Sequence, residues 1–412
     1  MQSKFPMGTW LFMDLDKFTK RDVEHWRDCG LTLTMSPNYN PEKHDIAKML
    51  EIMDYCHECG IKLIVCDSRS RWIGASTDPE AYKAKFEEAY KDFGKHPATW
   101  GFYLGDEPGL NAADDVIKAY EIQLEVAPEL VPYVNYFPFW HPSIEDIANS
   151  IFPRLTNMKN LCYDYYAQMR KVPVIDGYFM QLRRFKEIAD EHNCPLWTTL
   201  LSSAHWSYEE PTKNDFIWQI NSAVASGCEG LLWYRFYSEK NTVTTYRAAP
   251  INLFGERSEV YTRLSEAVRE FHLYYGDYFA RLKLQKSYHA TKAFGGYPLF
   301  KQGDSDVVLK VEDLYSGQPA IVSFYKDENG DDYFAVMNNS KTDSARISIT
   351  ISSNAGKIVN VGNEKVVTPT EITTALLVGG GTDKADADSI PDSYDHIGWY
   401  GPGQMNLYKI EK

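Results

Sequence analysis

The sequence predicts an α/β fold, a (β/α)₈ TIM barrel over residues 1–282, followed by a small antiparallel β-sandwich over residues 283–412. Two observations predict the barrel. Eight apolar, strand-like runs alternate with amphipathic segments up to residue 238, and such alternation produces parallel strands covered by helices. Eight units in about 240 residues is the usual size of this barrel. A doubly wound sheet is the alternative, but the glycine-rich phosphate loop expected after one of its early strands is absent.

Each expected strand is a short apolar run bounded by turn residues. Between the runs lie segments of helical periodicity, and residues 45–60 are one of them, with an apolar stripe along one face. The longer, more polar connections follow the strand C-termini, which is where a barrel has its active face. The expected strands span residues 9–15, 31–37, 61–68, 99–107, 130–138, 160–168, 195–205 and 230–238.

Residues 258–282 are expected to form a long helix that closes the barrel, and the sequence pattern changes after them. Short alternating runs broken by Gly, Asn and Asp follow. Residues 328–332, ENGDD, lie between two such runs and predict a hairpin. These features are typical of an antiparallel sandwich. An acid-rich run at 383–395 could hold a structural Ca²⁺, although such runs are usually solvated.

Composition excludes several classes of function. The net charge of -14 would repel nucleic acid, and no apolar run approaches the length of a membrane span. The seven cysteines form no disulfide framework, and the absence of any HxH pair disfavours a metal-dependent hydrolase, so no cofactor is expected. The first residues lack the apolar core of a signal peptide, which leaves a cytoplasmic location or an exported protein whose signal has been removed. No oligomeric state is indicated.

Two adjacent acids, Asp106 and Glu107, end the fourth apolar run. A carboxylate at the end of a buried strand needs water, a partner or a substrate, although it could also cap the next helix. Side chains in a barrel strand alternate between inside and outside. Strict alternation turns Glu107 and Tyr103 into the mouth and Asp106 away from it. We therefore expect Glu107 to be a catalytic acid and Asp106 to support it.

Glycoside hydrolysis needs a second carboxyl group. Each candidate lies at or beyond another expected strand end and also has a structural explanation: a helix cap after strand seven, or an ion pair with Arg235 or Arg69. The predicted catalytic pair is Glu107 with Glu210. The alternatives for the second acid are Asp164, Glu209, Asp106 and Asp67.

Aromatic and amide side chains cluster at or just beyond the expected strand ends. Aromatic rings stack on the apolar face of a sugar, while Asn and His side chains bind hydroxyl groups. Packing alone would explain any one of these residues, so the clustering is the signal. The predicted sugar-binding residues are Asn38, Tyr39, Trp72, Asn135, Tyr136, Trp140, Tyr166, His205, Trp206, Trp233 and Tyr234.

Three stretches carry a resemblance to a known group: GFYLGDEP at 101–108, and residues 208–238 and 251–271. Together they resemble glycoside-hydrolase-like barrels of polysaccharide-degrading bacteria, related to the beta-galactosidase and cellulase-type barrels of glycosidase clan A. The resemblance implies an acid/base at Glu107 and a nucleophile at the end of strand seven. This sequence departs from the pattern there, with His205 near the expected place, and Asp106 stands where an Asn usually precedes the acid/base.

The resemblance favours a periplasmic or extracellular glycoside hydrolase with a carbohydrate substrate. Its departures leave three readings open: Glu210 acts from the loop, a different second acid acts, or hydrolysis is lost. The alternative function is therefore a non-catalytic carbohydrate-binding protein on a degenerate barrel.

Overall fold

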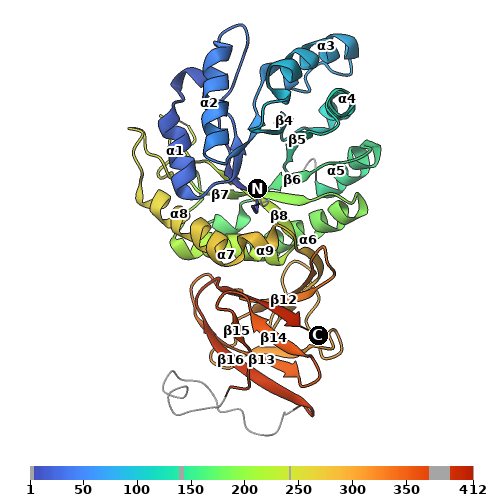
Figure 1. The fold of residues 1–412 in the computed structure, drawn as a ribbon, viewed down its shortest axis with the longest axis vertical. Coiled ribbons are helices and arrows are strands. Elements are labelled where there is room, and N and C mark those ends of the chain that lie inside the picture. The colour runs from blue at the N-terminus through green and yellow to red at the C-terminus, as the bar shows by residue number, and fades with distance from the viewer. Residues whose placement is uncertain (1–3, 139–142, 241–242, 371–389, 412) are drawn as a thin grey trace.

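The computed structural model describes residues 4–138, 143–240, 243–370 and 390–411 and confirms the predicted fold class. A ring of helices surrounds a parallel sheet, and a smaller all-β unit lies below it in Figure 1. Within these described residues, no helix is long and apolar enough to cross a membrane.

Eight parallel strands form the barrel sheet, in the order β1-β8-β7-β6-β5-β4-β3-β2. Each is followed by a helical connection, as the alternation predicts. The strands are β1 (Met7–Thr9), β2 (Leu33–Met35), β3 (Lys62–Val65), β4 (Thr99–Asp106), β5 (Val131–Tyr136), β6 (Leu161–Asp164), β7 (Leu196–Leu201) and β8 (Cys228–Tyr234).

The seam between β1 and β2 closes the barrel through side chains as well as backbone. The hydroxyl of Thr32 accepts from Met7 N at 3.0 Å, and Thr34 Oγ1 donates to Thr9 O at 3.0 Å. A Cβ at Gly8 would lie 1.6 Å from Leu33 O, so only glycine permits this approach. The expected first strand at 9–15 was therefore wrong in position: the strand ends at Thr9, and a 3₁₀ turn (Leu15–Lys17) follows.

The helices of the barrel begin at the polar residues that the sequence offers. Thr19, Ser143 and Thr212 each form a capping box with the residue three positions later. The helices are α1 (Lys20–Cys29), α2 (Ile46–Glu58), α3 (Pro79–Ala89), α4 (Ala113–Val126), α5 (Ile144–Ser150), α6 (Ile175–Glu191), α7 (Lys213–Ala225), α8 (Glu259–Phe271) and the short α9 (Asp277–Phe279). The expected single closing helix at 258–282 is thus interrupted, by a π-helical segment (His272–Gly276).

Large aromatic rings fill the barrel interior. Trp10 contacts the rings of Tyr103 and Tyr133 at centroid distances of 5.7 and 6.3 Å, and Trp100 stacks on Trp197 at 4.7 Å. A barrel of eight strands is a packed core rather than a pore. A ligand can therefore enter only the mouth above these rings.

The C-terminal unit contains a three-stranded sheet, β10-β13-β16, and a six-stranded sheet, β15-β14-β17-β12-β11-β9. The predicted hairpin is confirmed, because β11 and β12 pair antiparallel around residues 327–331. The strands are β9 (Lys283–Ala290), β10 (Val308–Asp313), β11 (Ala320–Lys326), β12 (Asp332–Asn338), β13 (Ala345–Ser352), β14 (Lys357–Asn360), β15 (Lys365–Val366), β16 (Ser393–Tyr400) and β17 (Met405–Glu411).

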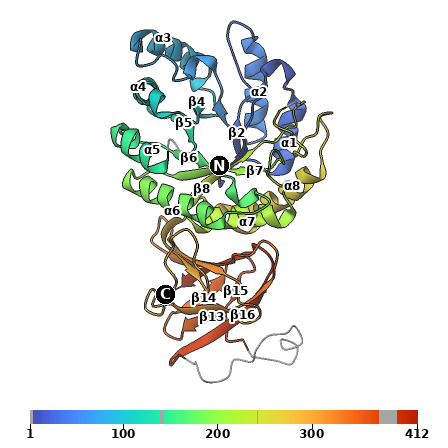
Figure 2. The ribbon, with the colours of Figure 1, turned by 180° about the vertical axis from the view of Figure 1, so that it is seen from behind.

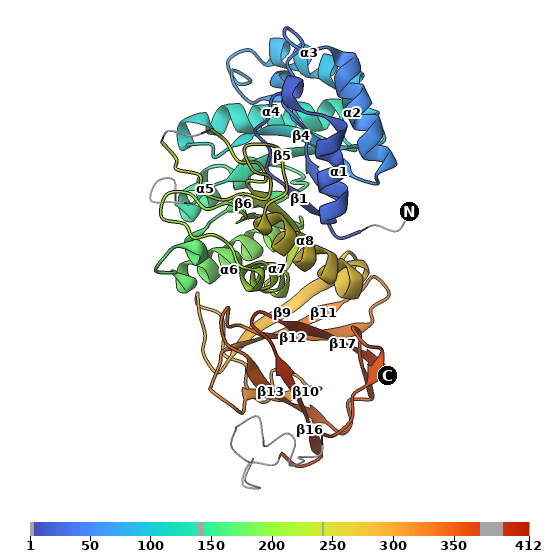
Figure 3. The same cartoon turned by 90° about the vertical axis from the view of Figure 1, so that its left-hand side faces the viewer.

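The six-stranded sheet packs against α7, on the barrel side of the sandwich (Figures 2 and 3). Ser323 Oγ donates to Ala225 O at 2.6 Å, and Tyr325 OH donates to Val224 O at 3.1 Å. Ile321 and Met337 belong to the same buried hydrophobic cluster as the barrel residues. The barrel-facing side of the six-stranded sheet therefore belongs to the apolar core of the barrel, while the interior of the sandwich forms a second cluster.

Candidate functional site

Strand β4 carries a bulge that sets the direction of its acids. Tyr103 pairs with Tyr133 of β5, but the next pairs are Gly105 with Val134 and Asp106 with Asn135, so one residue of β4 is extra. A bulge re-aims the side chains that follow it. Asp106 consequently points to the same side as Tyr103, and its Oδ1 accepts from Asn135 Nδ2 at 3.2 Å. The expectation that Asp106 faces away from the mouth was wrong, because strict alternation ignores the bulge.

Trp72 explains why glycine precedes this acid. A Cβ on Gly105 would lie 1.8 Å from Cζ3 of the Trp72 ring. The indole, which comes from the loop after β3, therefore packs directly on the β4 backbone beside Asp106. Trp72 is half-buried, so part of this predicted sugar-binding ring is open to a ligand.

Asn135 connects the acids of two strands. Its Nδ2 donates to Asp164 Oδ1 at 2.6 Å as well as to Asp106. Its Oδ1 accepts from Thr199 Oγ1 at 3.3 Å, which fixes the orientation of the amide. Asn135 was predicted to bind sugar directly. With an exposed fraction of 2%, it instead holds two carboxyl groups together.

Glu107 lies at the end of β4, exposed at the mouth. Its backbone has a φ of 45°, and its N–H donates to Asn135 O at 2.8 Å. A positive φ is uncommon for a residue other than glycine and turns the chain sharply after the strand. Desolvation by the surrounding protein raises the pKa of Glu107.

The three acids influence one another. Burial, followed by the charge of Glu107, raises the pKa of Asp106 to about 7. Burial raises the pKa of Asp164 well above its usual range, and the charges of Glu107 and then Asp106 add to the rise; hydrogen bonds from Asn135 and Tyr166 oppose it. Carboxylates that share a low-dielectric site cannot all ionise. The cluster therefore retains a proton near neutral pH, as a general acid requires.

Aromatic residues border the acids on the β6–β8 side. The ring of Tyr166 stacks with that of Tyr234 at 6.1 Å, and His205 lies 5.6 Å from Tyr234. His205 Nδ1 lies 3.1 Å from Ser203 O, and burial lowers the pKa of this histidine. Three predicted binding residues thus meet beside Asp164. Trp206 is 62% exposed and extends this rim.

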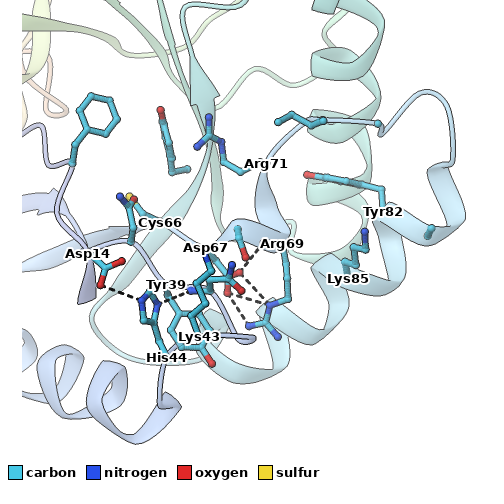
Figure 4. A pocket seen from close by; sticks show the side chains of 18 of the residues that line it. Asp14, Tyr39, Lys43, His44, Cys66, Asp67, Arg69, Arg71, Tyr82 and Lys85 are labelled. Carbon is cyan, nitrogen blue, oxygen red and sulfur yellow. Dashed lines mark hydrogen bonds and ion pairs between the residues drawn. The ribbon is translucent and has the colours of Figure 1, made fainter. Parts of the chain in front are cut away.

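A cavity of about 710 Å³ opens over the ends of β1, β2 and β3. Figure 4 shows part of its lining, including Tyr39, Asp67 and Arg71. Asn38 and Tyr39, both predicted, lie in this wall. Asp67 caps the following turn and pairs with Arg69 Nη2 at 2.8 Å, so its structural explanation holds. Tyr103 belongs to the lining as well, and it connects the cavity to the acid cluster.

Three residues that the sequence analysis did not place in the site contact residues that it did. Arg71 lies with its guanidinium carbon 4.6 Å from the centroid of the Tyr103 ring, and its charge lowers the pKa of Asp106 against the effect of burial. Tyr208 and Tyr246 contact His205 at 4.9 and 5.2 Å. The signal for Arg71 was its place directly before Trp72. Nothing local marked Tyr246, which comes from the long loop after β8.

Other predicted residues lie elsewhere. Glu210 pairs with Arg263 of α8 at 2.9 Å, and Glu209 is exposed beside it. The ion pair with Arg263 gives Glu210 a structural role at the surface of α8. Asp164 does not pair with Arg235, because that guanidinium binds Glu239.

Two predicted binding residues, Tyr136 and Trp233, are 2% and 0% exposed, so they belong to the core and not to the rim. Both lie next to a residue that points into the barrel, and alternation turns them toward the helices. The predicted Trp140 lies outside the described residues.

The described residues contain one group with metal-ligand spacing: Asp14, Asp16 and His44 lie within 4.8 Å of one another. Both nitrogens of His44 are already engaged. Nε2 lies 3.2 Å from Asp14 Oδ1, and Nδ1 accepts from Asn40 N at 2.9 Å. The group is therefore explained as a hydrogen-bonded loop anchor. The acid-rich run at 383–395, where Ca²⁺ was considered, lies largely outside the described residues.

The sequence matches no protein-family model and no curated protein. The fold, in contrast, is similar to several solved structures. Beta-galactosidase from Bacillus circulans sp. alkalophilus has a TM-score of 0.63 at 9% identity, over 99% of both chains. A GH42 beta-galactosidase from G. stearothermophilus has a TM-score of 0.59 at 7% identity, over 99% of this chain and 98% of that one.

A match to beta-galactosidase from the psychrophilic Marinomonas ef1 has a TM-score of 0.52 at 11% identity and covers 65% of this chain and 60% of that chain. This chain thus matches less than two thirds of that enzyme's length. At such identities the likeness shows the fold alone: a TIM barrel followed by a β-sandwich, as in these glycosidases.

Proposed function

We propose that this protein is a glycoside hydrolase in which Glu107 is the general acid and Asp164 is the second carboxyl group. The observation that carries the proposal is the group of three carboxyl groups with raised pKa values at the mouth of the barrel, from β4 and β6. The similarity of the fold to beta-galactosidases supports it.

The role of Glu107 follows from its exposure. It is the most exposed acid of the three, so a leaving group can reach it from solvent, and its raised pKa keeps the proton available. In the reaction the proton moves to the glycosidic oxygen as its bond to the anomeric carbon breaks. Water supplies the hydroxyl group that the anomeric carbon then carries, and the other proton of that water goes to the Glu107 carboxylate, which restores the acid.

Asp164 takes the second role because it lies two strands from Glu107, across β5. After burial, the charge of Glu107 makes the largest contribution to its raised pKa, so the two groups act on each other. Hydrogen bonds from Asn135 and Tyr166 stabilise the carboxylate form once the proton is lost. Ionised Asp164 would stabilise positive charge that develops on the sugar. Asp106 shares the Asn135 amide and keeps the local pKa values high.

The test compares two leaving groups in the Glu107→Gln variant. On an oligosaccharide or a methyl glycoside, whose leaving group needs a proton, we expect kcat/KM to fall by about 10²- to 10⁴-fold. On a 2,4-dinitrophenyl glycoside, which needs no protonation, we expect a much smaller loss. Asp164→Asn should lose activity on both substrates, while Glu210→Gln serves as the matched control. Undiminished turnover of the oligosaccharide by Glu107→Gln would refute the assignment.

One observation favours a second candidate, a carbohydrate-binding protein without activity. Strand β7 is followed by Ser202, Ser203 and His205, with no acid at the position where the clan resemblance implies a nucleophile. This candidate predicts sugar binding by calorimetry with no hydrolysis across a broad glycan panel. An exported location goes with either function and is checked by cell fractionation.

A further inference from the structure

The cavity beside the acid cluster is rich in cations. Its lining contains four Lys or Arg residues and three Asp residues, in a chain whose net charge is -14. The acids already have partners: Asp67 binds Arg69, Asp14 lies 3.2 Å from His44 Nε2, and Asp78 caps α3 through Ala81 N. The lining therefore carries one more basic than acidic side chain, in a chain that is acidic as a whole.

Three cations of the lining lack an acidic partner. Arg69 is neutralised by Asp67 and Asp92, each at 2.8 Å. For Arg71, Lys43 and Lys85, in contrast, no ion pair occurs in the described part of the chain. Figure 4 shows the same contrast, since dashed lines join Arg69 to its neighbours and none reaches Arg71.

Arg71 is the best placed of the three. Its guanidinium carbon lies 4.6 Å from the Tyr103 ring centroid and 5.9 Å from that of Trp72, so two aromatic rings position it. Its Nε is buried without a hydrogen-bond partner. A buried donor left unpaired costs free energy unless something binds it. The planar fork of a guanidinium matches the oxygens of a carboxylate or a sulfate.

We infer that the cavity over β1–β3 binds a negatively charged sugar unit of the substrate, with Arg71 as the anion-binding residue and Lys43 and Lys85 flanking it. The ligand class is a glycan that carries a carboxylate or a sulfate ester. The inference rests on the proposed function for its placement, because the cavity adjoins the acids through Arg71 and Tyr103. It adds the chemical class of the substrate, which the acids alone do not define.

Binding, rather than turnover, is the measurement that tests this inference, because loss of Arg71 also removes a charge that lowers the pKa of Asp106. Isothermal titration calorimetry would compare galacturonate and glucuronate with their methyl esters, and galactose 6-sulfate with galactose. We expect the wild type to bind at least one charged sugar about 10- to 100-fold more tightly than its neutral counterpart. The pair that shows the preference tells carboxylate from sulfate.

Arg71→Gln keeps a side chain that can donate hydrogen bonds, but it shortens the side chain and removes its charge. We expect it to abolish the preference for the charged sugar and to leave affinity for the neutral one unchanged. Lys43→Gln/Lys85→Gln, which alters only exposed side chains, should reduce the preference several-fold and covers the case that Arg71→Gln does not fold. The matched control is Arg154→Gln, whose arginine is 51% exposed and pairs with Asp114 outside the cavity.

Equal affinity of the wild type for charged and neutral sugars would overturn the inference, as would an equal loss of both in Arg71→Gln. The outcomes also separate this inference from the proposed function. Binding of charged sugars without hydrolysis of any glycan leaves the anion site standing and removes the hydrolase. Hydrolysis of neutral glycans with no preference for charged sugars would support the hydrolase and rule out the anion site.

Discussion

At the scale of single residues, Asp106 points to the side opposite to the one that strict alternation assigns it, while Glu107 stays at the mouth. The sequence singles out these two acids, because two carboxylates at the end of a buried strand need a partner. It could not reveal that Asp106 points inward, because that direction follows from the bulge in β4. At the same place the ring of Trp72, which is 33 residues away in the sequence, packs on Gly105. Glu210 was a reasonable second acid by position, but its partner Arg263 lies on α8, and only folding brings the two together.

The raised pKa of Asp106 predicts a pH-dependent stability. The ordinary pKa of this group is 3.8 and its folded value is about 7. Between these values the folded protein holds a proton that the unfolded chain releases, so the free energy of unfolding falls as the pH rises from about 4 to about 7. Asp106→Asn removes this effect. We expect the variant to exceed the wild type in unfolding free energy by roughly 1 kcal/mol or more at pH 8, and by little at pH 4.

Calorimetric melting at the two pH values measures this difference. The variant should also lose activity, which is the usual exchange between stability and function at a site. Glu209→Gln, which changes an exposed acid outside the cluster, is the control and should show no such pH dependence. An equal shift of the melting temperature at pH 4 and pH 8 would contradict the prediction.

At the scale of elements, the existence of all eight strands was predictable and their details were not. Apolar runs between turn residues identify strands, but β1 already ends at Thr9, and it meets β2 across the seam through Gly8 and Thr34. The aromatic rim was predicted as a set. Tyr166, Tyr234 and His205 do meet at the mouth, whereas Tyr136 and Trp233 lie one position out of phase and face the helices. A shift of one residue along a strand moves a side chain to the opposite face of the sheet, and the amino-acid composition of the strand does not show this shift.

The bulge in β4 gives a prediction at this scale. In Gly105→Ala the new Cβ would overlap the Trp72 ring, so the indole must leave its place beside Asp106. We expect a loss of about 1–3 kcal/mol in unfolding free energy, as for other overpacked sites, and a fall in activity. Gly398→Ala in β16 is the matched control, since its nearest neighbour, Tyr400 Cε2, would lie at 3.5 Å. Denaturant titration of both variants tests this, and equal stability would show that Trp72 is not constrained by Gly105.

At the scale of the whole molecule, the barrel and the sandwich are joined by a continuous apolar core. Alternating runs after residue 283 predicted the sandwich, but its attachment was not predictable, since the contacts come from residues 98 to 182 positions apart. Trp218 Nε1 donates to Asn339 Oδ1 at 2.8 Å, and Asn221 Nδ2 donates to Gly403 O at 2.9 Å. Ile321 and Leu407 lie within the barrel's hydrophobic cluster. The sandwich therefore supports the helices that support β7 and β8, which form one side of the site.

This shared core predicts that the full chain unfolds as one unit. Scanning calorimetry should show a single transition, with calorimetric and van't Hoff enthalpies that agree. Tyr325→Phe removes the hydrogen bond to Val224 O across the interface and should cost about 1 kcal/mol. Because the units are coupled, this variant should move the whole transition down by about 2 °C or less, with no separate sandwich transition. Two resolved transitions, or a shift confined to one of them, would mean that the sandwich unfolds independently of the barrel and does not stabilise the site.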